Sequence, residues 1–306
     1  MVVHNRHKTN VLKSFETNNR DVDSLILQNL NISENESNII KHSWQYTVQL
    51  NPITFYANDI DLQPNNEQQV WKETRYLFLY KKVLAILNKL TWVTFKELIA
   101  KFQELPIENI ECLETIAKIV ALKAFDEPTF GPLYAALCKA LNITITFQDE
   151  NDMVSEITFI KCIINVCQQY FQKECLADDI NNNDISVEQD LIQRRLKLRA
   201  IGCLRFIGEI FKLSLLSPLV VLYCVNTLYA KTNENSLEYL CSLLKTAGKE
   251  LYEKVNLNEI LRHLTYLTSD DMRHKISPRI RFMIRDVIEL TMNMNISDAN
   301  LPLVYS

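Results

Sequence analysis

The chain has 306 residues, of which 47% are apolar and only four are glycine, and its formal net charge is −4. So few glycines disfavour all-β folds and phosphate-cradling loops, because both need glycine where the backbone φ angle is positive. The negative charge disfavours a dedicated nucleic-acid binder, which usually carries a basic excess. We therefore expect an all-α protein with a substantial core.

The first part of the chain differs in composition from the rest. Residues 1–67 are rich in Asn, Asp and Ser and show no sustained apolar period, which is typical of disordered segments. We expect a disordered segment there, a folded domain over 68–293 and a short tail over 294–306. The sequence shows no signal peptide and no apolar run of transmembrane length. The eight cysteines include no Cys-x-x-Cys pair, so we expect a cytoplasmic protein with reduced thiols and no membrane contact.

From residue 68 onward the apolar residues recur with a helical period. Thr94-Phe95-Lys96-Glu97 matches a capping box and predicts a helix that ends at Pro106. Ser186-Val187-Glu188-Gln189 is a second such box and predicts a long helix to about Phe211, after an acidic, Asn-rich linker over 177–184. The other expected helices cover residues 109–125, 132–141, 155–175, 218 onward, 236–247, 256–268 and 278–293.

One segment between these helices has a different pattern. Residues 143–147 alternate apolar and polar side chains as a strand does. A strand without a partner is not stable, so we interpret residues 142–154 as a loop and expect no paired sheet within 68–293. Short connections between helices of 12–20 residues then predict an all-α, HEAT-like α-solenoid of about five antiparallel helix pairs.

Two glycines stand six residues apart in one predicted helix, at positions 202 and 208. Each costs about 1 kcal/mol relative to alanine inside a helix, which favours close approach to neighbouring helices at these points. Arg205, Glu209 and Lys212 form a charged stripe on the same helix. That stripe is either a solvated surface or a docking face.

Five blocks in the chain carry a family resemblance. They are Ile86-Leu87-Asn88-Lys89-Leu90-Thr91 with Phe95; Glu127-Pro128-Thr129-Phe130 with Tyr134-Ala135 and Leu137-Cys138; residues 201–213; residues 236–251; and Arg279-Ile280-Arg281-Phe282-Met283-Ile284-Arg285-Asp286-Val287. In this order they resemble the middle domain of eukaryotic translation initiation factor 4G. The sequence departs from that family at Trp92, where proline is usual, and residues 1–67 match no part of it.

The resemblance implies a translation-initiation scaffold that binds the initiation factor 4A RNA helicase and RNA. The translation initiation factor 3 complex is a further candidate partner. The residues that it assigns to helicase binding are Asn88, Lys89, Arg205, Glu209, Lys212, Arg279, Arg281 and Phe282. Phe282 lies among arginines on the polar side of its helix, and it either packs on the preceding repeat or contacts a partner.

Basic residues gather in two places in the sequence, and these are the candidates for phosphate contacts. They are Arg194, Arg195, Lys197 and Arg199 in the long helix, and Arg273 and Lys275 before the last helix. The alternative interpretation is that both clusters are ordinary charged residues of the protein surface without a ligand. With a net charge of −4, we expect RNA binding to be weak and non-specific, with a shallow dependence of affinity on salt because few phosphates are contacted.

No catalytic pattern is found, so we expect no enzyme activity and no cofactor. The five histidines show no metal-ligand spacing, and no Gly-x-x-x-x-Gly-Lys-Ser/Thr loop is present. Residues 223–229 match the Tyr-x4-Leu-hydrophobic motif that binds the cap-binding factor 4E, but they lie inside a predicted core helix, so this partner is not expected. A translational repressor that sequesters the helicase, or a scaffold in mRNA decay or splicing, remains an alternative.

Overall fold

The computed structural model describes residues 67–148, 154–176, 187–231 and 233–292. The expectations for the N-terminal segment before Glu67, for the 177–184 linker and for the C-terminal tail lie outside these ranges. Ten α-helices form in the described part. Those of the first half are α3 (Glu67–Leu87), α4 (Phe95–Gln103), α5 (Ile110–Asp126), α6 (Gly131–Ala140), α7 (Phe159–Tyr170) and α8 (Val187–Lys212). Those of the second half are α9 (Pro218–Lys231), α10 (Glu234–Tyr252), α11 (Asn258–Leu267) and α12 (Pro278–Met292).

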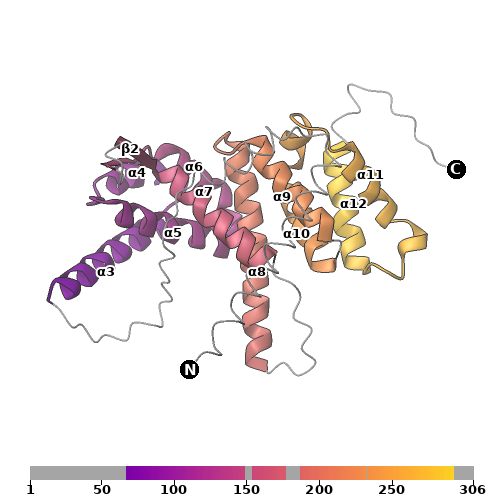
Figure 1. Cartoon of the computed structure of the whole chain (residues 1–306), viewed down its shortest axis with the longest axis horizontal. Helices are drawn as coiled ribbons and strands as arrows, with labels where there is room; N and C mark the ends of the chain where they lie inside the picture. The colour runs from indigo at the N-terminus through magenta and orange to yellow at the C-terminus, as the bar shows by residue number, and fades with distance from the viewer. Residues whose placement is uncertain (1–66, 149–153, 177–186, 232, 293–306) are drawn as a thin grey trace, which may run out of the picture.

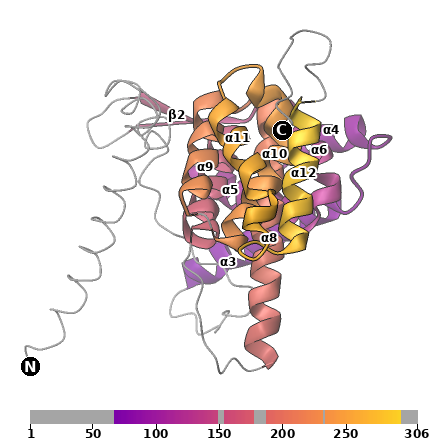
Figure 2. The same ribbon diagram turned by 90° about the vertical axis from the view of Figure 1, so that its right-hand side faces the viewer.

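The helices follow one another as five antiparallel pairs, α3/α4 to α11/α12, in an elongated row that runs from indigo to yellow in Figure 1. The second helix of each pair packs against the second helix of the next pair, in the order α6, α8, α10 and α12. Figure 2 looks along this row and separates α9 and α11 from α10 and α12. The first turns of α8 project from the body of the row in both views. The expected all-α solenoid is confirmed.

Helix starts follow local hydrogen bonding only in part. The Asn109 side chain caps α5 by accepting a hydrogen bond from Cys112 N at 2.8 Å, and Pro218 and Pro278 occupy the first positions of α9 and α12. The predicted capping box at Thr94 is wrong. Its hydroxyl donates to the Lys89 carbonyl at 2.7 Å, and Glu97 pairs with Lys101 instead of reaching back. Ser186, the first residue of the second box, lies outside the described residues.

The expectation of a loop without paired strands over 142–154 is also wrong. Strands β1 (Thr144–Gln148) and β2 (Val154–Thr158) form an antiparallel hairpin with Ile145 opposite Ile157. The partner strand occupies the start of the segment that was predicted as the helix over 155–175. That segment therefore begins its helix at Phe159 as α7, and it ends in a short π-helix, η2 (Phe171–Cys175). Ile157 is buried, and the hairpin is packed against the core along this side.

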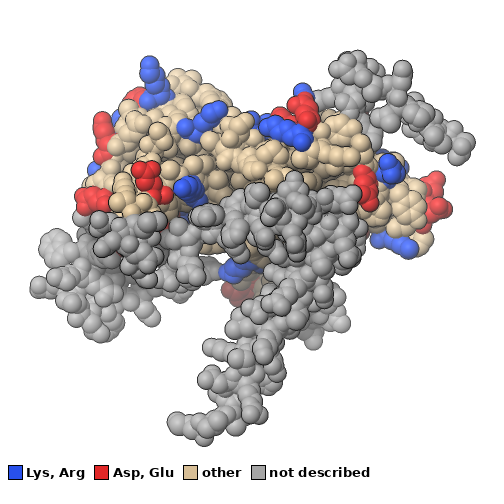
Figure 3. Space-filling model, turned by 45° about the horizontal axis from the view of Figure 1, so that its top comes forward, with Lys and Arg blue, Asp and Glu red and all other residues tan. Residues whose placement is uncertain are grey.

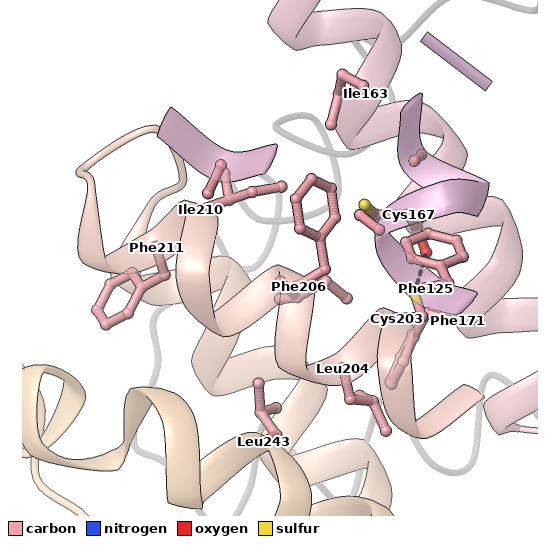
Figure 4. Packing of buried hydrophobic residues seen from close by; sticks show 14 of the residues in the cluster. Phe125, Ile163, Cys167, Phe171, Cys203, Leu204, Phe206, Ile210, Phe211 and Leu243 are labelled. Carbon is pink, nitrogen blue, oxygen red and sulfur yellow. Dashed lines mark hydrogen bonds between the residues drawn. The ribbon is translucent and has the colours of Figure 1, made fainter. Parts of the chain in front are cut away.

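The core runs through the whole row and is dense where α8 crosses α5. Gly202 lies against the end of α5, and a Cβ atom added there would sit 1.9 Å from the Phe125 carbonyl oxygen. A Cβ on Gly208 would sit 2.8 Å from the Thr246 side chain of α10. The prediction of close helix approach at both glycines is therefore confirmed. Figure 4 shows the aromatic packing at this crossing, where the rings of Phe125 and Phe206 meet edge to face at 6.0 Å.

All eight cysteines are free and buried in this core. The Cys203 thiol donates to the Cys167 carbonyl at 3.8 Å, the contact drawn as a dashed line in Figure 4. Burial raises the pKa of the Cys162 and Cys241 thiols to about 12. A thiol with so high a pKa stays neutral at physiological pH, so these cysteines behave as small apolar side chains.

Candidate docking and RNA-binding surfaces

The first candidate surface is the turn that follows α3. Asn88 and Lys89 are both exposed there. The turn is held by hydroxyl contacts, since Thr91 N donates to the Thr94 hydroxyl at 3.0 Å and that hydroxyl donates to the Lys89 carbonyl. A turn held in this way presents its side chains with little conformational freedom to lose on binding.

Two apolar side chains stand out from this turn, and the sequence reasoning did not select them. Trp92 is 65% exposed and Val93 is 95% exposed. The Trp92 ring is braced by Phe95, with 5.8 Å between ring centroids. The only signal in the sequence was the departure from the family at Trp92, where a large aromatic residue replaces the usual proline.

The second candidate surface is the charged stripe of α8. Arg205 and Lys212 are exposed, whereas Glu209 is mostly covered and pairs with Lys212 at 3.1 Å. On the opposite side of the helix, Ile207 and Phe211 are buried in the core. The stripe thus has the amphipathic placement that the sequence predicts, and Arg205 is an exposed cation outside the Lys212–Glu209 pair.

The third candidate surface is α12, where the predicted residues have different surroundings. Phe282 is 63% exposed and Arg285 stacks over its ring at 5.9 Å. Packing on the preceding repeat is therefore not its role, and the ring is free for a partner. Arg281 is different, because its guanidinium donates to the Thr268 carbonyl at 2.9 Å and its side chain is only 11% exposed. It ties α12 to the end of α11.

Arg279, also predicted for docking, is engaged with a buried carboxylate. It forms an ion pair with Glu238 of α10, whose side chain is 3% exposed. The start of α12 is further tied to α10, because Ser277 N donates to Glu234 Oε1 at 2.7 Å. The three candidate surfaces therefore occupy successive parts of the row from α3 to α12, rather than one pocket (Figure 1).

The basic cluster of α8 is less free than its sequence suggests. Lys197 lies 2.9 Å from Glu238, and Arg199 makes two hydrogen bonds to Asp126 at 2.6 and 2.7 Å. The Asp126 contact raises the pKa of Arg199 and keeps its charge in place. Arg194 forms only a surface pair with Asp190 at 2.9 Å, and Arg195 is exposed. Exposed pairs of this kind contribute little and open readily to a ligand.

The basic residues of the second cluster, like those elsewhere on the surface, are scattered and lie near acidic residues. Arg273 and Lys275 are exposed in the turn before α12, next to Asp270 and Asp271. On the face drawn in Figure 3, lysine and arginine side chains are scattered, several of them beside acidic side chains, and they do not form one patch. Such a surface offers few simultaneous phosphate contacts.

Other kinds of site find no support among the residues that the structure describes. None of their His, Cys, Asp and Glu side chains gather in threes or more with the geometry of a metal site. Likewise, no helix in the described ranges is long and apolar enough to cross a membrane. The segment that matches the factor 4E motif lies within α9, where Cys224 and Leu228 are fully buried.

Comparison with known proteins gives one consistent family. A model described as the MIF4G domain matches residues 80–293. The chain is 33% identical over 230 residues to eukaryotic translation initiation factor 4 gamma 3 of Mus musculus, and 31% identical over 230 residues to factor 4 gamma 1 of the same organism. Each match covers 69% of this chain and 14% of the relative.

A plant relative gives the same picture. Over 225 residues, the chain is 29% identical to eukaryotic translation initiation factor 4G of Oryza sativa subsp. japonica, covering 70% of this chain and 12% of that protein. The chain therefore spans no more than 14% of the length of these three relatives. The domain match includes all three candidate surfaces, and the chain belongs to the MIF4G-domain family.

Proposed function

We propose that this protein is a translation-initiation scaffold that binds the factor 4A RNA helicase through the α3 turn, α8 and α12. The observation that carries the proposal is Phe282, a large aromatic side chain that is 63% exposed on a helix otherwise well packed. Aromatic residues and arginine are enriched at the centres of protein interfaces, where a few side chains supply most of the binding energy. Arg285 beside it and Arg205 on α8 supply the charge.

The mechanism we propose is a shift in the helicase's conformational equilibrium. A scaffold that contacts both helicase domains and binds their closed arrangement more tightly than the open one raises the closed population. The extended row suits this role, because its candidate surfaces are spread from the α3 turn to α12. The α3 turn would meet one helicase domain and α12 the other.

The test is a binding titration of purified factor 4A against single variants. Phe282→Ala should weaken binding by roughly thirtyfold, the loss expected of an interface hot spot. Arg205→Glu should weaken it by about tenfold through charge reversal at an exposed position. Tyr266→Ala is the matched control, because Tyr266 is an aromatic residue on α11 that is 52% exposed and outside the candidate surfaces. Equal affinity for wild type, Phe282→Ala and Arg205→Glu would remove the docking surface that we assign.

Charge reversal at Arg279 or Arg281 is a poor test of docking in this protein. Arg279 neutralises the buried Glu238 carboxylate and Arg281 caps the end of α11. Either reversal would place an acidic group beside these contacts and disturb α12 itself. A loss of binding would then report on folding rather than on the interface.

For RNA we propose weak, non-specific binding through the cations that remain accessible, which are Arg194, Arg195, Arg273 and Lys275. Few phosphate contacts give a shallow dependence of affinity on salt. Whether the protein activates or represses translation is decided by tethering it to a reporter mRNA. An increase in reporter output supports the scaffold, whereas a decrease that excess factor 4A reverses would support a repressor that sequesters the helicase.

A further inference from the structure

The Glu238 carboxylate is shared by two cations that come from different helices. Lys197 Nζ of α8 lies 2.9 Å from Oε2, and it also donates to Asn235 Oδ1 at 2.5 Å. The Arg279 guanidinium of α12 donates to Oε1, and it reaches Oε2 at 3.4 Å. One buried anion on α10 thus holds a lysine and an arginine that are 82 residues apart in sequence (279 minus 197).

The exposure of these three side chains is uneven. Glu238 is 3% exposed, whereas Lys197 is 35% and Arg279 is 69% exposed. Solvent and ligands therefore reach the two cations but not the anion that neutralises them. Lysine and arginine have long flexible stems, so either head group can turn outward toward a phosphate without moving the helices.

Turning outward has a cost, because it leaves the buried carboxylate with a single partner. A buried charge that loses one of its two partners gives up part of its compensation, and one that loses both is strongly unfavourable, far more so than an exposed pair that opens. The remaining cation is then held more firmly. By thermodynamic linkage, an anion bound at one of the two cations opposes anion binding at the other.

We propose that Glu238 is a built-in competitor for RNA phosphates, which keeps Lys197 and Arg279 from binding RNA in the resting protein. This inference rests on the proposed function only in naming RNA as the anionic ligand. It explains why a basic cluster that looks like a phosphate site in the sequence would bind weakly. Removing the carboxylate charge should create a stronger RNA-binding surface between α8 and α12.

The experiment measures the affinity of a short fluorescein-labelled oligouridylate in a KCl titration. Glu238→Gln should bind at least about tenfold more tightly than wild type, because two cations become free for charge-assisted contacts with phosphates. Its salt slope should steepen by about 1.4, since each of two phosphates contributes about 0.7 for a single strand. Glu253→Gln is the matched control, because it removes the same charge from an exposed residue at the other end of α10.

A second pair of variants tests the same idea without touching Glu238. Lys197→Met should leave RNA affinity within about twofold of wild type, because the masked lysine makes no phosphate contact, whereas the exposed Arg195→Met should lower it by about fivefold. Adding Lys197→Met and Arg279→Met to Glu238→Gln should abolish the gain. The inference is overturned if Glu238→Gln binds no more tightly than Glu253→Gln, or if Lys197→Met weakens binding as much as Arg195→Met. Helicase binding by wild type is a separate measurement, so the two proposals can fail independently.

Discussion

The helices of the row are held together by different interactions at two contacts, the contact of α5 with α8 and the contact of α8, α10 and α12. In the first half, the backbone of α8 at Gly202 touches the end of α5 directly, with apolar rings on both sides. In the second half, α8 also approaches α10 closely at Gly208, but here α8, α10 and α12 meet in addition across the buried charge of Glu238. The ion pair between α8 and α5, Arg199–Asp126, is by contrast partly exposed. Contacts of the first kind depend on shape and respond little to salt, whereas contacts between charges compete with ions and ligands. The first joint thus provides rigidity, and the second can respond to what binds.

The largest effect is expected at the first joint. Gly202→Ala would place a Cβ atom 1.9 Å from the Phe125 carbonyl oxygen, and a backbone group cannot move aside as a side chain can. We expect a loss of at least about 3 kcal/mol in the free energy of unfolding, measured by urea denaturation. Gly131→Ala is the control, since its nearest neighbour would be Glu209 Cγ at 3.5 Å, an ordinary contact. Equal stability of the two variants would contradict the close approach.

The contact of α8, α10 and α12 at Glu238 should be strongly destabilised only when both of its cations, Lys197 and Arg279, are removed. Lys197→Met or Arg279→Met leaves Glu238 with one partner, and we expect about 1 kcal/mol for each. The double variant leaves a buried carboxylate without a cation and should cost about 4 kcal/mol, more than the sum of the two. Hydrogen exchange should show the loosening in α12 and leave α5 protected. Additive effects would mean that the two cations do not share Glu238.

The Glu127 carboxylate, in the first half of the row, can be compared with the buried Glu238 carboxylate because its partners are close in sequence. Glu127 accepts a hydrogen bond from the Tyr134 hydroxyl at 2.6 Å and pairs with Lys123 at 2.6 Å. Burial raises the pKa of Glu127, but these two contacts outweigh it and the pKa is lowered from 4.5. A lowered carboxyl pKa contributes stability above the unfolded pKa, and that contribution is lost as pH falls through the folded value.

Tyr134→Phe should therefore cost about 2 kcal/mol at pH 7, the value of a hydrogen bond to a charged group. The cost should shrink as the pH falls below 4.5 and through the lowered pKa of folded Glu127, where this carboxylate becomes protonated in the folded protein. Urea denaturation of both proteins at several pH values measures this difference. A cost that does not change with pH would show that the ring packing of Tyr134, not its hydroxyl, matters.

The smallest effect, and a stabilising one, is expected at the turn between the two halves. Ser214 follows α8 with a positive φ of 60°, and its neighbour Leu215 N donates back to the Ile210 carbonyl at 3.2 Å. Glycine adopts this conformation without steric cost. Ser214→Gly should raise the free energy of unfolding by about 0.5 kcal/mol. A loss of stability would show that the serine side chain makes a contact of its own.

The parts of the fold that could be predicted from sequence are those with a local cause. Helical periods, Pro218, Pro278 and the glycines at 202 and 208 all act through neighbouring residues or through a missing side chain. The β1–β2 hairpin was missed because its partner strand reads as the start of the helix after it, and the pairing becomes visible only when both strands are placed.

The candidate site shows the same limit more clearly. Arg205 and Phe282 lie on the polar faces of their helices, and the helical period alone places them at the surface. Lys197, Arg279 and Arg281 also look like surface charges, but each is engaged with a residue of another helix or turn. Lys197 and Glu238 are 41 residues apart in sequence (238 minus 197). No local pattern in a single sequence pairs residues at such separations.

The buried cysteines allow local unfolding of this protein to be measured by thiol modification. Each helix from α5 to α10 carries at least one cysteine, and α11 and α12 carry none. Because all eight thiols are buried, an alkylating reagent reaches each one only when its part of the fold opens. The order in which the eight sites are modified under mild denaturant would rank the three central pairs, from α5/α6 to α9/α10, by their opening free energies without any introduced label.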